Sequence, residues 1–258
     1  MIIDSHCHLT YEPISNTLKE TIDRANKDGI KYMLTISTED KSFERILKIV
    51  NSHKSVYGTY GIHPHEAKLH QHIQRVDIIN KVNQNKKIIG IGETGLDFYY
   101  NHSEKKDQIY SFEEHISAAQ EKNLPLIVHT RSAEKETFEI LKKHLKKKNF
   151  KILIHCFTGS RRFAFDLLDL GSYISASGVI TFKKSQELAN IFKDLPNEKI
   201  LVETDAPYLA PVPLRGKPNE PSYIVHTVKF LSNLKNIPYK EFSERTSNNF
   251  FDLFGKLN

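Results

Sequence analysis

The chain begins with Met1-Ile2-Ile3-Asp4-Ser5-His6-Cys7-His8-Leu9, an apolar stretch that ends in two histidines. Side chains two residues apart on a β-strand point to the same face, so the imidazoles of His6 and His8 can reach one ion. Taken alone, such a pair is more typical of polar residues at a strand end than of a metal site. The rest of the chain decides between these two interpretations.

The length and composition suit one globular domain. The chain has 258 residues and 39% hydrophobic content, enough for a single core of the size of an α/β barrel. We therefore expect one domain spanning residues 1–258. The net charge is +6 with a pI near 9.0, which tolerates a polyanionic partner without proving one.

The sequence favours a soluble cytoplasmic protein and a monomer. No apolar run is long enough to span a membrane, and the start of the chain lacks the pattern of a secretory signal. Cys7 and Cys156 each stand beside a histidine in an apolar run, which suits reduced packing residues better than a disulfide.

Short apolar runs alternate with longer segments of helical periodicity. Strands are expected near residues 1–9, 31–36, 56–62, 87–92, 126–129, 151–155, 172–176 and 199–204. Helices are expected near residues 15–27, 40–51, 74–83, 105–122, 135–147, 163–170, 184–193, 224–234 and 239–254. This rhythm predicts an α/β fold of the TIM-type (β/α)8 class, regular or distorted, with a doubly wound open sheet as the competing architecture.

Residues of metal-ligand type directly follow five of these apolar runs: His6, His8, Glu93, His129, His155 and Asp205. In a parallel barrel the carboxyl ends of the strands converge on one mouth, where such side chains can meet. In a doubly wound sheet they would be spread along an edge. The set as a whole therefore indicates a metal centre, although no single member does.

The stretch Gly90-Ile91-Gly92-Glu93-Thr94-Gly95 has the spacing of a dinucleotide-binding turn. Glu93 would place a carboxylate beside the pyrophosphate, and no amphipathic helix follows. The glycines are better explained by close approach of the backbone to an ion-binding carboxylate.

The chain resembles the TatD family of metal-dependent deoxyribonucleases, a branch of the amidohydrolase-like barrels. The resemblance covers nearly the whole length, and it departs from the family at Thr10, where Asp or Asn is common. Six stretches carry it: Asp4-Ser5-His6-Cys7-His8, Gly61-Ile62-His63-Pro64-His65, Gly92-Glu93-Thr94-Gly95-Leu96-Asp97, Pro125-Leu126-Ile127-Val128-His129-Thr130-Arg131, His155-Cys156-Phe157-Thr158-Gly159 and Glu203-Thr204-Asp205-Ala206-Pro207-Tyr208.

The resemblance implies 3′ to 5′ exonuclease activity on DNA and a centre of two divalent ions, Mg²⁺, Mn²⁺ or Zn²⁺. It assigns one ion to His6, His8 and Asp205 and the other to His129 and His155. Glu93 would bridge the two. The same resemblance implies that the loop containing His63 and His65 handles phosphate.

Chemical roles can be assigned to several further residues. We expect Asp205 to accept the proton of the attacking water, while Glu203 either shares that task or orients a ligand histidine. Arg131 is placed to pair with a phosphate, and Arg215-Gly216-Lys217 is a further candidate. Tyr99, Tyr100 and Tyr208 could stack on unpaired bases or pack against neighbouring helices.

Two other functions fit the same residues. The first is an esterase or deacylase of the amidohydrolase type, acting for example on aminoacyl-tRNA or a lactone. The second is a non-catalytic nucleic-acid-binding protein, which has no use for six metal-ligand residues. RNA in place of DNA also stays open as the substrate.

Overall fold

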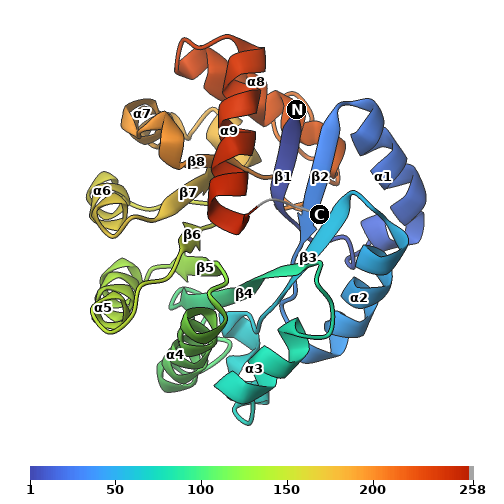
Figure 1. Ribbon diagram of the computed structural model, residues 1–258. Coiled ribbons are helices and arrows are strands. Elements are labelled where there is room, and N and C mark those ends of the chain that lie inside the picture. The colour runs from blue at the N-terminus through green and yellow to red at the C-terminus, as the bar shows by residue number, and fades with distance from the viewer. Residues whose placement is uncertain (256–258) are drawn as a thin grey trace. The chain divides into compact units, whose positions relative to one another are not determined.

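The structure is a computed structural model that describes residues 1–255. Strands and helices alternate along the chain, as the colour change in Figure 1 shows. The strands are β1 (Ile2–Cys7), β2 (Ile30–Thr35), β3 (Val56–Tyr60), β4 (Ile88–Asp97), β5 (Leu126–Arg131), β6 (Ile152–Ile154), β7 (Tyr173–Ala176) and β8 (Ile200–Val202). The α-helices are α1 (Leu18–Lys27), α2 (Phe43–Ser52), α3 (Arg75–Val82), α4 (Lys105–Lys122), α5 (Glu134–Leu145), α6 (Arg161–Asp169), α7 (Gln186–Asp194), α8 (Ile224–Leu234) and α9 (Tyr239–Phe254).

The strand order decides between the two predicted architectures. Within residues 1–255 the sheet contains eight strands, and they follow one another in chain order from β1 to β8. The pairs β1–β2, β3–β4, β4–β5, β5–β6 and β7–β8 are parallel. A doubly wound sheet would reverse its strand order at a switch point. The predicted TIM-type (β/α)8 fold class is therefore confirmed.

Contacts divide the described chain into two compact units. Unit 1 contains residues 1–35, 156–161 and the chain from Tyr173 onward, and so carries β1, β2, β7 and β8. Unit 2 contains residues 36–155 and 162–172, with β3 to β6. The single domain expected from the chain length stays a prediction.

In unit 1 the chain after β8 is held against the end of β1. The backbone N–H of Asp205 donates to the carbonyl oxygen of His6 at 2.9 Å, and the N–H of His8 donates to that of Ala206 at 2.8 Å. Helix α9, red in Figure 1, packs against both β1 and β8. These contacts place the segment that carries Asp205 beside the end of β1, where His6 and His8 lie.

In unit 2, β4 is longer than the expected strand 87–92, because it continues to Asp97. The stretch with dinucleotide-type spacing thus lies inside a strand and is not a turn. Gly95 has φ +137° and is paired with His129, where a Cβ atom would lie 2.0 Å from the carbonyl oxygen of His129. Glycine is required there because β4 and β5 approach each other so closely.

Two further expectations concern membranes and cysteines. Among residues 1–255 no helix combines the length and the apolar character needed to cross a membrane. Within residues 1–255, Cys7 and Cys156 are not joined in a disulfide. The thiol of Cys7 is buried and donates to the carbonyl oxygen of Leu34 at 3.5 Å, so it is a packing residue.

Candidate metal centre

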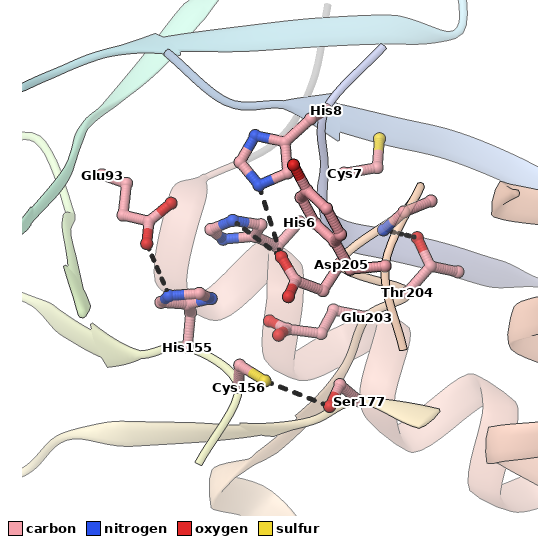
Figure 2. A network of polar contacts seen from close by, with 12 residues as sticks. His6, Cys7, His8, Glu93, His155, Cys156, Ser177, Glu203, Thr204 and Asp205 are labelled. Atoms are coloured by element: carbon pink, nitrogen blue, oxygen red, sulfur yellow. Dashed lines mark hydrogen bonds and ion pairs between the residues drawn. The ribbon is translucent and has the colours of Figure 1, made fainter. Parts of the chain in front are cut away.

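The first group of predicted ligands lies in unit 1, where β1 and β8 end. Nε2 of His8 lies 3.3 Å and Nε2 of His6 lies 3.7 Å from the same oxygen, Oδ1 of Asp205 (Figure 2). Both histidines are buried, whereas the Asp205 side chain is 14% exposed. We call His6, His8 and Asp205 the His6 cluster. Two imidazoles and one accessible carboxylate are a suitable ligand set for a divalent cation.

Asp4 holds the segment that carries Asp205. Its buried carboxylate accepts hydrogen bonds from the backbone N–H of Thr204 at 2.9 Å and from the Thr204 hydroxyl at 2.6 Å. Burial raises the pKa of Asp4 to about 7, although the hydrogen bonds from Thr204 oppose the shift. Asp4 is absent from the predicted site residues, yet its even spacing from His6 and His8 is a signal that could have identified it.

Glu203 is fully buried directly after β8. Its Oε2 accepts a hydrogen bond from the hydroxyl of Ser175 in β7. The Ser175 hydroxyl accepts the backbone N–H of Cys156 at 3.1 Å. The Ser175 hydroxyl, itself fixed by the backbone N–H of Cys156, thus holds the Glu203 carboxylate in place. This favours an orienting role for Glu203 over proton transfer.

The second group lies in unit 2 around Oε1 of Glu93. This oxygen is 2.8 Å from Nε2 of His155 (Figure 2) and 3.1 Å from Nδ1 of His129. It is also 3.4 Å from Nε2 of His63. We call His63, Glu93, His129 and His155 the Glu93 cluster. Glu93 lies in β4 and His129 in β5, His155 directly follows β6, and His63 comes three residues after the end of β3. Parallel pairing of these adjacent strands brings the four residues together.

The Glu93 cluster favours positive charge beside the carboxylate. Burial opposes ionisation of Glu93, but the imidazoles of His155, His63 and His129 hold the pKa of its carboxyl well below the usual range. Burial opposes protonation of His129, but hydrogen bonds to Asp97 and Glu93 raise the pKa of its imidazole. Burial lowers the pKa of His63 well below that of an exposed histidine, so this residue is neutral.

The donor atoms of the Glu93 cluster fit a divalent cation. One ligand atom each from His63, Glu93 and His129 lies within 4.8 Å of the others. Nδ1 of His129 and Nε2 of His155 are 3.3 Å apart. Lone pairs this close to one another and to a carboxylate oxygen require a proton or a cation among them. Imidazole and carboxylate are also the ligands that Zn²⁺ and other divalent ions accept in proteins.

The hydrogen bonds of His63 set it apart from the other imidazoles. Its Nδ1 accepts the backbone N–H of His65 at 3.1 Å, so the neutral ring carries its proton on Nε2. That nitrogen faces Oε1 of Glu93. In this tautomer Nε2–H of His63 donates toward Glu93, and the phosphate-binding role predicted for His63 stays a prediction.

His65 has a different partner. Its Nε2 lies 2.9 Å from Oδ2 of Asp97, and the same oxygen lies 3.2 Å from Nε2 of His129. Burial opposes ionisation of Asp97, but hydrogen bonds from His129, Tyr100 and His65 hold its pKa below the usual range. Asp97 is missing from the predicted site residues. The sequence missed it because the expected strand ended at Gly92, whereas β4 carries both Glu93 and Asp97, four residues apart, on the same face.

Arg131 ends β5 and lies over exposed aromatic rings. Its guanidinium carbon is 4.2 Å from the ring centre of Tyr99 and 4.7 Å from that of Tyr100. Tyr99 is 60% exposed and Tyr100 is 49% exposed. The two tyrosines therefore do not pack under neighbouring helices, and the base-stacking role stays a prediction.

The other predicted substrate contacts belong to unit 1. Tyr208 is 53% exposed, and its ring centre lies 6.3 Å from that of His8. Tyr11, which was not predicted, stacks on His8 with ring centres 4.8 Å apart. Arg215 lies over the ring of Phe182 at 4.1 Å, a cation–π contact that accounts for its position.

The predicted ligands thus come together in two clusters, each within one unit. His6, His8 and Asp205 share one cluster, and Glu93, His129 and His155 share the other. The combination of both clusters into one two-ion centre stays a prediction.

The chain is similar to known proteins over nearly its whole length. Residues 3–255 match the family described as TatD related DNase. A Buchnera aphidicola (subsp. Acyrthosiphon pisum) protein named uncharacterized metal-dependent hydrolase BU355 is 39% identical over 261 residues, 98% of this chain and 98% of that protein. The Escherichia coli K12 protein named uncharacterized metal-dependent hydrolase YcfH is 36% identical over 257 residues, 98% of this chain and 95% of that protein.

Solved structures agree with this relationship. The crystal structure of YjjV, a TatD homologue from Escherichia coli K12, matches with a TM-score of 0.91 and 27% sequence identity. The match covers 99% of this chain and 98% of that one. The resemblance predicted from the six motifs is confirmed: the chain belongs to the TatD-related DNase family.

Proposed function

We propose that the chain is a divalent-metal-dependent hydrolase that cleaves the phosphodiester bonds of DNA as a 3′ to 5′ exonuclease. The observation that carries the proposal is the convergence of imidazole nitrogens of His63, His129 and His155 on one oxygen of Glu93. The names of the relatives support metal-dependent hydrolysis, and the family description supports DNA as the substrate.

In this proposal two divalent ions are held by residues of both clusters. His6, His8 and Asp205 would hold one ion, His129 and His155 would hold the other, and Glu93 would supply a carboxylate to the centre. Mg²⁺, Mn²⁺ and Zn²⁺ all accept imidazole and carboxylate ligands. When bound, such ions neutralise charge on the phosphoryl oxygens and lower the pKa of water.

The carboxylates take different tasks in the proposed reaction. Asp205 accepts the proton of the attacking water on a carboxylate oxygen, because its side chain is 14% exposed and water can reach it. Glu203 is fully buried, and its Oε2 accepts a hydrogen bond from the Ser175 hydroxyl. We therefore assign it the task of holding neighbouring groups in position and not that of the base.

The phosphate contacts follow from the hydrogen-bond arrangement. His63 presents Nε2–H as a donor to a phosphate oxygen, because its Nδ1 is occupied by the N–H of His65. Arg131 offers an exposed guanidinium beside Tyr99 and Tyr100. His65 keeps its Nε2 on Asp97 and is the second imidazole of this loop that we assign to phosphate binding.

The direction of cleavage is tested with single-stranded DNA labelled at its 5′ end. The protein is freed of metal with a chelator and reconstituted separately with Mg²⁺, Mn²⁺ and Zn²⁺. A 3′ to 5′ exonuclease produces a ladder of labelled strands that shorten with time. Immediate release of the labelled nucleotide, or no cleavage with any of the three ions, would contradict the proposal.

The proposed base is tested by comparing Asp205→Asn with Glu203→Gln. The loss of general-base catalysis should lower kcat at least about 100-fold in Asp205→Asn, and the loss in Glu203→Gln should be smaller. The pH profile of kcat is recorded for both variants. Full activity of Asp205→Asn would rule out the assignment of the base.

A substrate panel separates the proposal from the other functions. The same ligands can polarise the carbonyl of an ester or amide. Faster turnover of an aminoacyl-tRNA or a lactone than of DNA would therefore identify an esterase or deacylase. Equal binding of DNA with and without metal, with no turnover of any substrate, would identify a nucleic-acid-binding protein.

A further inference from the structure

Asp97 is fixed by hydrogen bonds to the backbone of the following residues and to the side chain of Gln108. The side chain is 1% exposed, and its Oδ1 accepts the backbone N–H groups of Tyr99 and Tyr100, both at 3.0 Å. Its own N–H donates to Oε1 of Gln108 at 2.8 Å, and Nε2 of Gln108 donates to its carbonyl oxygen at 3.0 Å. The carboxylate therefore has little freedom to rotate or shift.

The other carboxylate oxygen of Asp97 faces two imidazoles. Oδ2 lies 2.9 Å from Nε2 of His65 and 3.2 Å from Nε2 of His129. An ionised carboxylate only accepts hydrogen bonds, so each of these nitrogens must carry a proton. In the opposite tautomer of His129, a lone pair on Nε2 would face Oδ2 and the hydrogen bond would be lost.

The other nitrogen of His129 faces the Glu93 cluster. Nδ1 lies 3.1 Å from Oε1 of Glu93 and 3.3 Å from Nε2 of His155. A histidine can bind a metal ion through Nδ1 only when that nitrogen has a free lone pair and the proton lies on Nε2. Carboxylates that accept the second ring N–H of a ligand histidine fix both its tautomer and its orientation.

We propose that Asp97 is a positioning residue that fixes the Nε2–H tautomers of His129 and His65, and thereby directs the Nδ1 lone pair of His129 into the Glu93 cluster. The inference rests on the proposed metal-dependent function and assigns a role to a residue that is not among the predicted metal ligands. It also explains why a buried carboxylate stands between a ligand histidine and the loop of His63 and His65.

Two substitutions of Asp97 separate positioning from a structural role. Asn is nearly the same size and keeps an oxygen for the N–H groups of Tyr99 and Tyr100. Its amide NH₂ would then face the imidazoles, which forces a lone pair onto Nε2 and the proton of His129 onto Nδ1. Ala removes every side-chain contact but imposes no tautomer on His129.

We expect Asp97→Asn to lose more metal affinity than Asp97→Ala, and Asp97→Ala to lose more stability than Asp97→Asn. Zn²⁺ affinity, measured by competition with a fluorescent chelator, should fall about 10- to 100-fold in Asp97→Asn and less in Asp97→Ala. The urea midpoint should fall more in Asp97→Ala than in Asp97→Asn. A merely structural role predicts that both quantities fall more in Asp97→Ala, and that outcome would overturn the inference.

The tautomer itself is read by ¹⁵N NMR of the histidine rings in the Zn²⁺-loaded protein. His129 of the wild-type protein should show a protonated Nε2, and this signal should be lost in Asp97→Asn. A protonated Nε2 on His129 in Asp97→Asn would contradict the inference. Asp107→Asn is the matched control, because Asp107 is a buried carboxylate in the first turn of α4 and should change neither the signal nor the Zn²⁺ affinity.

The measurements distinguish failure of the inference from failure of the proposed function. If the wild-type protein and Asp97→Asn bind Zn²⁺ equally tightly, the inference alone is wrong. If the wild-type protein binds neither Zn²⁺ nor Mn²⁺, the proposed function is wrong and the inference falls with it. None of these measurements depends on the identity of the substrate.

Discussion

Hydrogen-bond partners decide what each buried histidine of this chain can do. Nδ1 of His63 accepts a backbone N–H, so its Nε2 donates, while Nε2 of His129 faces a carboxylate. His115 in α4 is a third case. Its Nδ1 donates to the carbonyl oxygen of Ser111 at 2.7 Å, and its Nε2 accepts the N–H of Ile62 at 3.1 Å. It supports the loop that begins at His63 and is not part of either cluster.

His115 should make folding stability depend on pH. Burial lowers its pKa from 6.5 to about 4, so the unfolded chain binds a proton in this range that the folded chain does not. The contribution is present in full above pH 6.5 and is lost as the pH falls toward 4. Between pH 7.5 and pH 5 the wild-type protein should lose about 2 kcal/mol more than His115→Gln.

This difference is measured by urea unfolding of both proteins at the two pH values. Other titrating groups cancel in the comparison because they are common to both proteins. Equal losses in the wild-type protein and in His115→Gln would contradict the assignment of a neutral, buried His115.

Neighbouring positions of β1 should respond differently to substitution. His6→Ala removes an imidazole of the His6 cluster and should lower the affinity for Mn²⁺ by about 100-fold or more. Cys7→Ala should retain Mn²⁺, because the thiol contacts the carbonyl oxygen of Leu34 instead. Binding is measured by titration calorimetry. Loss of Mn²⁺ binding in the folded Cys7→Ala protein would contradict the assignment of His6 and His8, rather than Cys7, to the face of β1 that binds metal.

Arg131 should contact a phosphate group of bound DNA. Arg131→Gln should reduce the slope of log affinity against log salt by about one, because one counterion fewer is released on binding. Affinity for single-stranded DNA is measured by fluorescence anisotropy over a series of salt concentrations. Arg45→Gln in α2, also at an exposed position of unit 2, is the control that should leave the slope unchanged. An unchanged slope in Arg131→Gln would remove Arg131 from the substrate contacts.

At the scale of secondary-structure elements, lysine side chains from distant positions cap the C-terminal ends of two helices, α7 and α2. Nζ of Lys235, after α8, donates to carbonyl oxygens of Phe192, Lys193 and Leu195 at the end of α7, at 3.2, 2.9 and 2.5 Å. Nζ of Lys87 caps α2 in the same way, through two carbonyl oxygens at 2.6 Å. The last carbonyl groups of a helix have no partner within it, so a cation placed there joins one element to another.

Lys235→Met should therefore lower the free energy of unfolding by about 1–2 kcal/mol, since charged hydrogen bonds to the end of α7 are lost. Lys229→Met is the matched control, because Lys229 is exposed on α8 and its substitution should change stability by less than about 0.5 kcal/mol. Both are measured by urea unfolding. Equal stabilities of the two variants would contradict a capping role.

For the whole molecule, bound metal should raise thermal stability. Any ion that binds the folded chain and not the unfolded one stabilises it by about 2.7 kcal/mol at 100 times its Kd. For a chain of this size, this corresponds to a rise in Tm of roughly 5–10 °C. Tm is measured after treatment with a chelator and again after addition of Mn²⁺. The double variant with His6→Ala and His129→Ala should show no rise, and a rise of the same size in this variant would place the binding elsewhere.

The alternation of elements could be read from the sequence because it depends on local hydrophobic periodicity. Each expected strand corresponds to an observed one, and the main error is β4, which continues past the expected end at Gly92 to Asp97. Glycine and polar residues interrupt the apolar pattern there, so periodicity could not show that the strand continues. The same error hid Asp97, since a residue in a loop has no defined face.

By itself, the sequence determined the kinds of residue at the site and the strands after which they stand. It supplied histidines and carboxylates after successive apolar runs, which parallel pairing then had to bring to the same ends of their strands. Only the tertiary structure decided which atoms of these residues meet and which nitrogen of each imidazole carries the proton. The physical reason is that a tautomer depends on hydrogen bonds across strands, such as that between Asp97 of β4 and His129 of β5, and strand register sets those bonds.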